Sequence, residues 1–188
     1  MRKIFPIVAA LLSSAAFIIP ASATAADNLD CAMQALDDES ELMQIGFENT
    51  LSFGNPKQSF SKSGSSMDLT AAVAVCAEEN GWSKSAAQFA SQYTLASATT
   101  RYLTVQMVMA DAPEDFGADL FADMSAAEMK TLRKSGKLSP LHMALVASTV
   151  QKYFGSNPKA GTKEMLLRWP QMLEDRDLAK AKFLKLAQ

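Results

Sequence analysis

The sequence predicts a single all-α domain of about six to eight helices, preceded by a short export signal. Apolar residues recur at intervals of three and four through most of the 188-residue chain, which is the period of an amphipathic helix. No segment alternates apolar and polar residues over the length of a strand, and many segments begin or end with residue types that cap helices. We therefore expect little or no β-sheet.

The first 25 residues have the pattern of a secretory signal peptide. The basic start Met1-Arg2-Lys3 precedes an apolar run over 4–19, and small residues follow. That run is shorter than the roughly 20 residues of a membrane-spanning helix. We expect cleavage after Ala25, with cleavage after Ala23 as the alternative. The mature domain, 26–188, is then periplasmic or secreted from a bacterium and has no transmembrane segment.

The segment 28–50 has apolar residues at helical spacing, and its acidic run 37–40 favours the start of a second short helix. The mature chain keeps two cysteines, Cys31 and Cys76. Because an oxidising compartment favours disulfides and a single pair has one connectivity, we expect a Cys31–Cys76 bond. Cys76 shares the apolar face of the next predicted helix, so this bond would join the first helix to that one.

The segment 52–66 is the clearest predicted loop, because it is rich in glycine, serine, asparagine and proline. Two interpretations remain open for it: slack chain inside the disulfide ring, or a binding loop. Ser66 is the expected cap of a helix over 67–80, which Gly81 ends.

The segment 83–110 is the longest predicted helix. Its apolar and small residues occupy more than one face, which is typical of a central helix. Arg101 and three glutamines exclude a membrane span for it. Pro113 either ends this helix or opens a further short one.

Helix boundaries are clearer in the last third of the chain. The capping box Ser125-Ala126-Ala127-Glu128 starts one helix, and Ser139-Pro140 starts another. A further helix begins near Thr162. We expect Pro170 to break it, because proline removes a backbone donor inside a helix. The last helix then spans 171–187.

Charge is distributed unevenly along the chain. The segment 26–128 holds sixteen acidic and four basic residues, a balance of −12, whereas 129–188 holds four acidic and twelve basic residues, a balance of +8. Opposite charges of this kind favour either pairing within the molecule or a basic face for a partner. The candidate partner-binding residues lie in the last helix: Arg176, Lys180, Lys182 and Lys185.

We expect no catalytic centre, no cofactor and no bound metal. His142 is the only histidine, and we interpret it as an ordinary helix residue, with a ligand or a pH-sensitive contact as the alternative. The acidic residues over 111–123 do not match the EF-hand frame, which needs glycine at its sixth position. The S-x-x-K sequences at 59–62 and 156–159 fall in predicted loops rather than at helix starts.

One short segment resembles a known family. Glu39-Ser40-Glu41-Leu42-Met43-Gln44-Ile45 is similar to two signatures of lytic transglycosylases, which are exported helical enzymes that cut peptidoglycan. The family separates these signatures along its chain, whereas here they abut and Glu41 stands where the family has glycine. The resemblance implies a general-acid role for Glu39.

These observations favour a non-catalytic interaction or accessory protein of the bacterial cell envelope. Its expected partner is an acidic envelope protein or an anionic lipid surface, and not nucleic acid, because the exported chain is acidic overall. Two alternatives remain. One is a periplasmic holdase that resembles small acid-stress chaperones in architecture, and the other is a peptidoglycan-cleaving enzyme that uses Glu39.

Overall fold

The computed structural model describes residues 28–36, 39–54, 59–112, 122, 124–135, 137–156 and 162–186. The predicted signal peptide and the predicted short helix after Pro113 lie outside these residues. Within them the secondary structure is entirely helical, with seven α-helices and one 3-10 turn, so the all-α prediction is confirmed. The elements are α2 (Cys31–Ala35), α3 (Glu39–Gly54), η1 (Phe60–Lys62), α4 (Gly64–Asn80), α5 (Lys84–Val108), α7 (Ala126–Ser135), α8 (Pro140–Phe154) and α9 (Thr162–Leu186).

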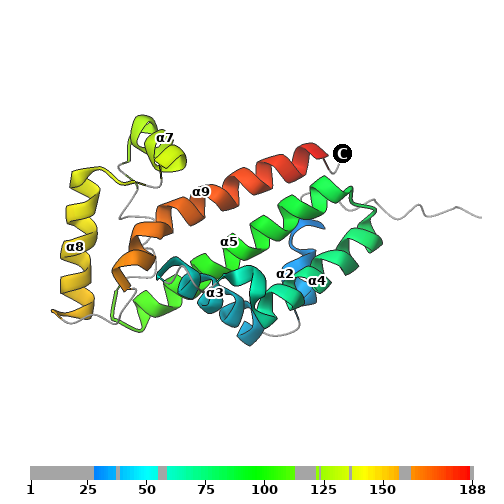
Figure 1. Ribbon diagram of the computed structural model, residues 1–188, viewed down its shortest axis with the longest axis horizontal. Helices are drawn as coiled ribbons and strands as arrows, with labels where there is room; N and C mark the ends of the chain where they lie inside the picture. The colour runs from blue at the N-terminus through cyan, green and yellow to red at the C-terminus, as the bar shows by residue number, and fades with distance from the viewer. Residues whose placement is uncertain are drawn as a thin grey trace, which may run out of the picture.

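The two longest helices, α5 and α9, lie side by side in opposite directions along the length of the molecule (Figure 1). Helix α3 packs on α5, and α2 and α4 cover the end of α5 where that helix begins. At the other end, α8 crosses the start of α9, and α7 stands beside α8. The predicted central position of the longest helix is therefore confirmed.

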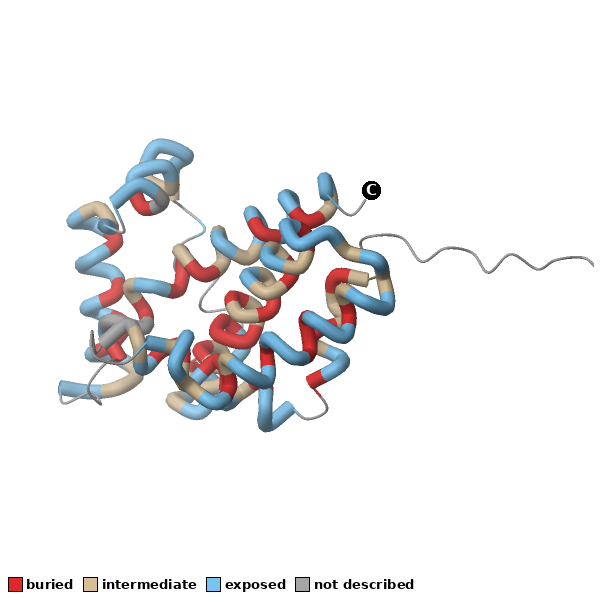
Figure 2. Tube along the Cα trace, turned by 45° about the vertical axis from the view of Figure 1, so that its right-hand side comes forward, coloured by how far each residue is buried: buried red, intermediate tan, exposed pale blue. Residues whose placement is uncertain are grey.

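Small side chains allow α5 to contact several neighbours at close range. Its buried positions are mainly alanine and threonine, and only two of them, Leu103 and Met107, are larger. The buried hydroxyl of Thr94 donates to Ala90 O at 3.0 Å, which satisfies that polar group inside the helix. Buried residues accordingly line the surfaces where α5, α9 and α3 meet, while α7 and the outer side of α8 are largely exposed (Figure 2).

The apolar core is divided among the ends and the middle of the bundle. At the end formed by α2, α4 and the start of α5, Leu29 and Phe183 are fully buried in one cluster. Trp82 packs edge-on against Phe183, with 4.9 Å between the ring centroids. The first and last described helical segments are therefore packed together.

The predicted disulfide is present. Cys31 and Cys76 are bonded, with 6.0 Å between their Cα atoms, and the bond joins α2 to α4. Cys76 is fully buried, as its place on the apolar face of the helix predicted.

The segment between α3 and α4 holds more helix than we expected. Helix α3 continues to Gly54, the 3-10 turn follows after residues that lie outside the described chain, and α4 begins at Gly64. The predicted cap, Ser66, is wrong: Ser63 is the N-cap, and its Oγ accepts the Ser66 N–H at 3.2 Å. The sequence contains a serine at each position, so the capping rule alone did not select the right one.

The predicted helix break at Pro170 is also wrong, because α9 runs without interruption from Thr162 to Leu186. Pro170 removes one backbone hydrogen bond and disfavours a helix interior by roughly 3 kcal/mol. Pro170 is fully buried, and its neighbours Trp169 and Met172 are 2 % and 9 % exposed. Burial of this apolar segment against α5 and α8 offsets the penalty.

Other predicted boundaries are confirmed. Ser83 caps α5 by accepting the Ala86 N–H at 3.1 Å, and Ser139 caps α8 with Pro140 in its first turn. Gly81 follows α4 with φ of 63°, a left-handed conformation that glycine adopts without strain.

Candidate functional site

The strongest candidate site is a groove between α3, α5 and α9. It has a volume of about 360 Å³, within the usual range for small-molecule sites. All three helices contribute to its walls, so it depends on the packing of the whole central layer. The lining residues are Asn49, Gln92, Leu95, Ala96, Met172, Asp175, Leu178, Ala179 and Lys182.

The groove combines an apolar wall with a few polar groups at its edges. Leu95, Met172 and Leu178 are the large apolar residues of the lining, and Leu178 is 44 % exposed. The polar groups are two amides, a carboxylate and an ammonium group, which come from Asn49, Gln92, Asp175 and Lys182. An apolar wall with a small number of placed polar groups is the usual composition of a binding site.

Asn49 is held in place by the central helix. It is 7 % exposed, and its side-chain Nδ2 donates to Thr99 Oγ1 at 2.9 Å. The Thr99 hydroxyl in turn donates to Leu95 O at 2.7 Å. Thr99 engages one of the two N–H groups of the Asn49 amide, so the carbonyl oxygen and the second N–H are the groups that remain for a molecule in the groove.

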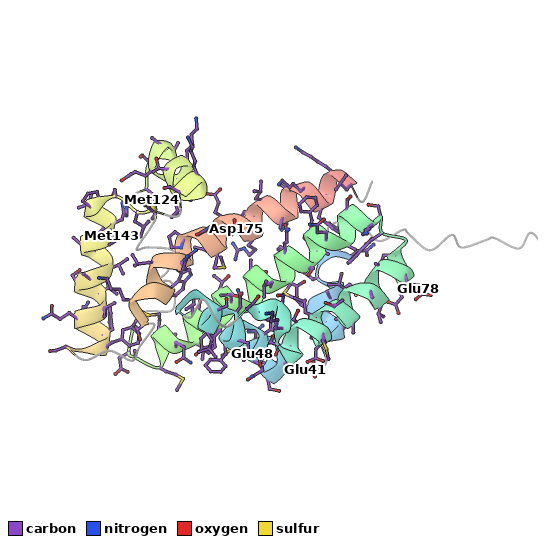
Figure 3. The ribbon with its side chains drawn as sticks, viewed as in Figure 1. Glu41, Glu48, Glu78, Met124, Met143 and Asp175 are labelled. Carbon is purple, nitrogen blue, oxygen red and sulfur yellow. A yellow bond between two sulfur atoms is a disulfide. The ribbon has the colours of Figure 1, made fainter. Side chains whose placement is uncertain are left out.

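Asp175 and Lys182 are the two charged groups of the groove, and both lie on α9. Asp175 is exposed, yet the surrounding protein partly desolvates its carboxylate and raises its pKa above the ordinary value. Asp175 is labelled on α9 in Figure 3. Lys182 Nζ lies 5.1 Å from the ring centroid of Phe89, within reach of a cation–π contact that holds the ammonium group near α5.

The four predicted partner-binding residues do not form one face. At 100° per residue, Arg176 and Lys180 share one flank of α9, whereas Lys182 and Lys185 share another. Lys182 lines the groove, and Lys185 follows it by one turn toward the end of the helix. Arg176 Nη2 instead contacts Asp177 Oδ1 of its own helix at 3.1 Å.

The acidic and basic residues, which are concentrated in different parts of the sequence, also lie on different sides of the helical bundle. Helices α3 and α4 contain acidic residues and no basic ones, and they lie on the opposite side of α5 from the basic end of α9 (Figure 1). The acid–base contacts of the described residues include Arg101–Glu39, Arg176–Asp177 and His142–Glu128. None of these contacts joins the basic end of α9 to the acids of α3 and α4.

A second hollow, also of about 360 Å³, lies where α3 meets the 3-10 turn. Phe47 and Leu51 line it and are each more than one-third exposed, and Glu48 lines it beside them. Partial burial raises the pKa of Glu48, but hydrogen bonds from Gln44, Ser65 and Ser63 outweigh that effect and hold the pKa below its usual value. The hollow borders the predicted loop, part of which lies outside the described residues.

Glu39, the general acid that the resemblance implies, and the histidine His142 are not among the lining residues of either hollow. Glu39 is on open surface at the start of α3, where its side chain is 65 % exposed and its Oε1 contacts Arg101 Nη2 at 2.8 Å. His142 is buried near the start of α8, and its Nδ1 lies 2.9 Å from Ser139 Oγ and 3.3 Å from Glu128 Oε1. Because serine and carboxylate approach the same ring nitrogen, this arrangement is not that of a catalytic triad, in which they approach opposite nitrogens.

Neither metal ligands nor a membrane span is found in the described part of the chain. No three histidine, cysteine, aspartate or glutamate side chains there gather as a metal site would require. None of the described helices has the length and hydropathy needed to cross a bilayer.

Comparisons of this chain with protein-family models, with curated proteins and with solved structures gave no match. Function is therefore argued from the residues of the groove and its surroundings.

Sequence reasoning identified one residue of the groove, Lys182, and missed the others. Asn49, Gln92 and Asp175 each appear in the sequence as ordinary polar positions of a helix. Only the mutual placement of three helices brings them together. A weak signal existed at Asn49, because it lies among the apolar positions of α3 and a buried amide needs a partner.

Proposed function

We propose that this chain is an exported, non-catalytic binding protein of the bacterial cell envelope, and that it acts through the groove between α3, α5 and α9. The observation that carries the proposal is the combination of an apolar wall with Asp175 at one position along α9 and Lys182 at another. The N-terminal sequence and the disulfide favour an oxidising compartment outside the cytoplasm.

The polar groups of the groove suit recognition more than chemistry. Two amides, one carboxylate and one ammonium group offer donors, acceptors and charges for a ligand. The groove contains no serine, cysteine or histidine that would act as a nucleophile with an adjacent base. Glu39 has an open and ion-paired position that offers no cleft for a polysaccharide chain, so we do not favour the peptidoglycan-cleaving alternative.

An acidic envelope protein is the partner that we favour at the rim of the groove. Lys182 and Lys185 follow one another on the same flank of α9, and Lys185 is exposed. Two cations on one edge attract an acidic surface and increase the rate of association. The described ion pairs include neither of these lysines, so both charges are available to a partner.

Charge reversal tests this assignment. We expect Lys182→Glu with Lys185→Glu to reduce the partner mass that co-purifies with the exported protein by about tenfold or more, because attraction becomes repulsion. The melting temperature should change little, since exposed charges contribute at most about 1 kcal/mol. Native mass spectrometry after mild cross-linking measures the first quantity, and thermal unfolding the second.

The matched control reverses two exposed lysines of α7, Lys130→Glu with Lys134→Glu, which changes the net charge by the same amount. The control should keep the partner mass. If Lys182→Glu with Lys185→Glu lowers the melting temperature but keeps the partner mass, these lysines form ion pairs within the molecule instead. Wild-type protein with no added mass would contradict the proposal.

The denatured mass of the same sample tests export, which requires a chain that begins at Ala26 and is two hydrogens lighter than its reduced form.

A further inference from the structure

The two charged residues of the groove, one acidic and one basic, lie at different positions along its length. Asp175 and Lys182 are seven residues apart on α9, which at 1.5 Å per residue separates their backbone positions by about 10.5 Å along the helix. Asn49 lines the groove together with Asp175, and Phe89 lies beside Lys182. A molecule along the groove therefore meets a carboxylate toward one end and an ammonium group toward the other.

The Asp175 end is built to accept hydrogen bonds from a cation. The Asp175 carboxylate is desolvated, and a bound positive charge compensates that loss of water. Asn49 lines the same groove, and its carbonyl oxygen is a second acceptor, while one N–H of its amide donates to Thr99 Oγ1 at 2.9 Å. A carboxylate and a carbonyl oxygen in one groove suit an ammonium group, which has three donors.

The Lys182 end is suited to an anion. Its ammonium group lies over the Phe89 ring at 5.1 Å from the centroid, which restricts the long side chain while leaving its N–H groups able to donate. Gln92 adds an amide to the same groove. A carboxylate accepts charge-assisted hydrogen bonds from such groups.

Between the ends, the groove is lined by apolar and small residues, among them Leu95, Ala96 and Leu178. A ligand therefore needs opposite charges at its two ends and an apolar middle. An extended peptide advances about 3.3–3.6 Å per residue, so about three residues match the separation of the Asp175 and Lys182 backbone positions along α9.

We propose that the groove binds a short apolar peptide of about three residues, with its N-terminal ammonium group at Asp175 and Asn49 and its C-terminal carboxylate at Lys182. This assignment rests on the proposed binding function and names the class of ligand for the same site. Backbone amides of the peptide reach Gln92, and its side chains cover the apolar wall.

Calorimetric titration of the mature protein with the tripeptide Ala-Leu-Ala tests the proposal. The free tripeptide should bind, and acetylation of its amino end should weaken binding about tenfold because the ammonium contact with Asp175 is lost. Amidation of its carboxyl end should weaken binding to a similar degree through Lys182. Asp175→Asn and Lys182→Gln should each reproduce the loss caused by the corresponding peptide change.

A double-mutant cycle separates direct contact from general weakening. The acetylated peptide should lose no further affinity on Asp175→Asn, and the amidated peptide none on Lys182→Gln. The matched controls, Asp177→Asn and Lys180→Gln, make the same chemical changes away from the lining of the groove and should bind the free tripeptide as the wild type does.

Several outcomes would overturn the peptide assignment. Binding that is indifferent to both end modifications would do so, as would the absence of tripeptide binding. Preferential binding of dodecanoate that depends on Lys182 alone would assign the groove to acyl anions. The broader binding function is judged separately by the partner mass on the exported protein, which does not depend on the tripeptide, so the two proposals can fail independently.

Discussion

Gly46 determines how closely α3 approaches the central helix. A methyl group at this position would lie well inside van der Waals contact of Ala98 O and 2.6 Å from Tyr102 Cβ. We expect Gly46→Ala to lower the free energy of unfolding by about 2 kcal/mol or more, because α3 must move away from α5 and the gain in helix propensity is only about 1 kcal/mol. Urea denaturation followed by circular dichroism measures the change.

Gly64 provides the control for this substitution. It also lies in a helix, at the first residue of α4, and an added Cβ there has no heavy atom within 4 Å. Gly64→Ala should therefore be neutral or slightly stabilising. Equal stability of the two variants would show that the approach of α3 to α5 is not limited by Gly46. Since Asn49 follows Gly46 by one turn of α3, movement of this helix should also weaken ligand binding in the groove.

The residues of the groove show where single-sequence reasoning stops. A basic side chain near the chain end is conspicuous, so Lys182 was identified as a candidate. Asp175 carries the same letter as its neighbour Asp177, both side chains are exposed, and nothing local distinguishes them. Of the two, Asp175 lines the groove, and partial desolvation raises its pKa, which is a property of the packed structure. The further step, to a ligand with two charged ends, required the spacing of Asp175 and Lys182 along α9.

At the scale of elements, one carboxylate connects α7 to α8. Glu128 Oε2 accepts hydrogen bonds from Ser125 N at 3.0 Å and Ser125 Oγ at 2.8 Å, which is the predicted capping box. Glu128 Oε1 also lies 3.3 Å from His142 Nδ1, at the start of α8. Hydrogen bonds from the Ser125 backbone and side chain, then from Ser139, and the nearby His142 lower the pKa of Glu128 to about 2.

The lowered pKa predicts how this contact depends on pH. In the folded protein Glu128 stays charged to about pH 2, whereas a glutamate in the unfolded chain has an ordinary pKa of 4.5, so the charged form stabilises the fold above about pH 4.5. This contribution decreases as the pH falls from about 4.5 and is lost as it passes through about 2. Glu128→Gln should therefore lower the melting temperature at pH 7 and have little effect near pH 2.

Paired thermal unfolding curves from pH 7 to pH 2 measure the difference between wild type and Glu128→Gln. The control is Glu78→Gln, which removes one exposed carboxylate of α4 (Figure 3). A Glu128→Gln effect of constant size across this range would mean that the carboxylate does not stabilise the α7–α8 connection through its charge.

Local signals predicted most helix ends, and tertiary packing decided the exceptions. Ser83, Ser139 and Gly81 act at the boundaries where capping rules place them, because these rules concern backbone groups within a few residues. Pro170 was assigned to a break because its own sequence neighbourhood disfavours a helix. Pro170 is fully buried and Trp169 packs in a cluster with residues of α5 and α8, so contacts with residues distant in sequence reverse that preference.

At the scale of the whole molecule, the two ends of the described part of the chain meet in one cluster. Leu29, at the start of the described chain, is buried with Phe183 of α9, and the Cys31–Cys76 bond holds the same region to α4. The sequence predicted the disulfide from compartment and cysteine count, but the contact between the first and last helices joins residues far apart in the chain. A change at the disulfide should therefore influence α9 and, with it, the groove.

Removal of the disulfide tests this connection. Cys31→Ala with Cys76→Ala opens a ring of sequence separation 45, and loop-closure entropy gives an expected loss of about 2–4 kcal/mol in unfolding free energy. The two tryptophans report on different regions, since Trp82 packs on Phe183 whereas Trp169 lies in the cluster at the α8 end. Denaturation followed by fluorescence in Trp82→Phe and Trp169→Phe backgrounds therefore separates the two regions. Because the long α5–α9 pair runs through both, we expect the midpoint to fall equally for both tryptophans. A shift confined to Trp82 would show that the α2–α4 end unfolds on its own, and the groove would then keep its ligand when the disulfide is reduced.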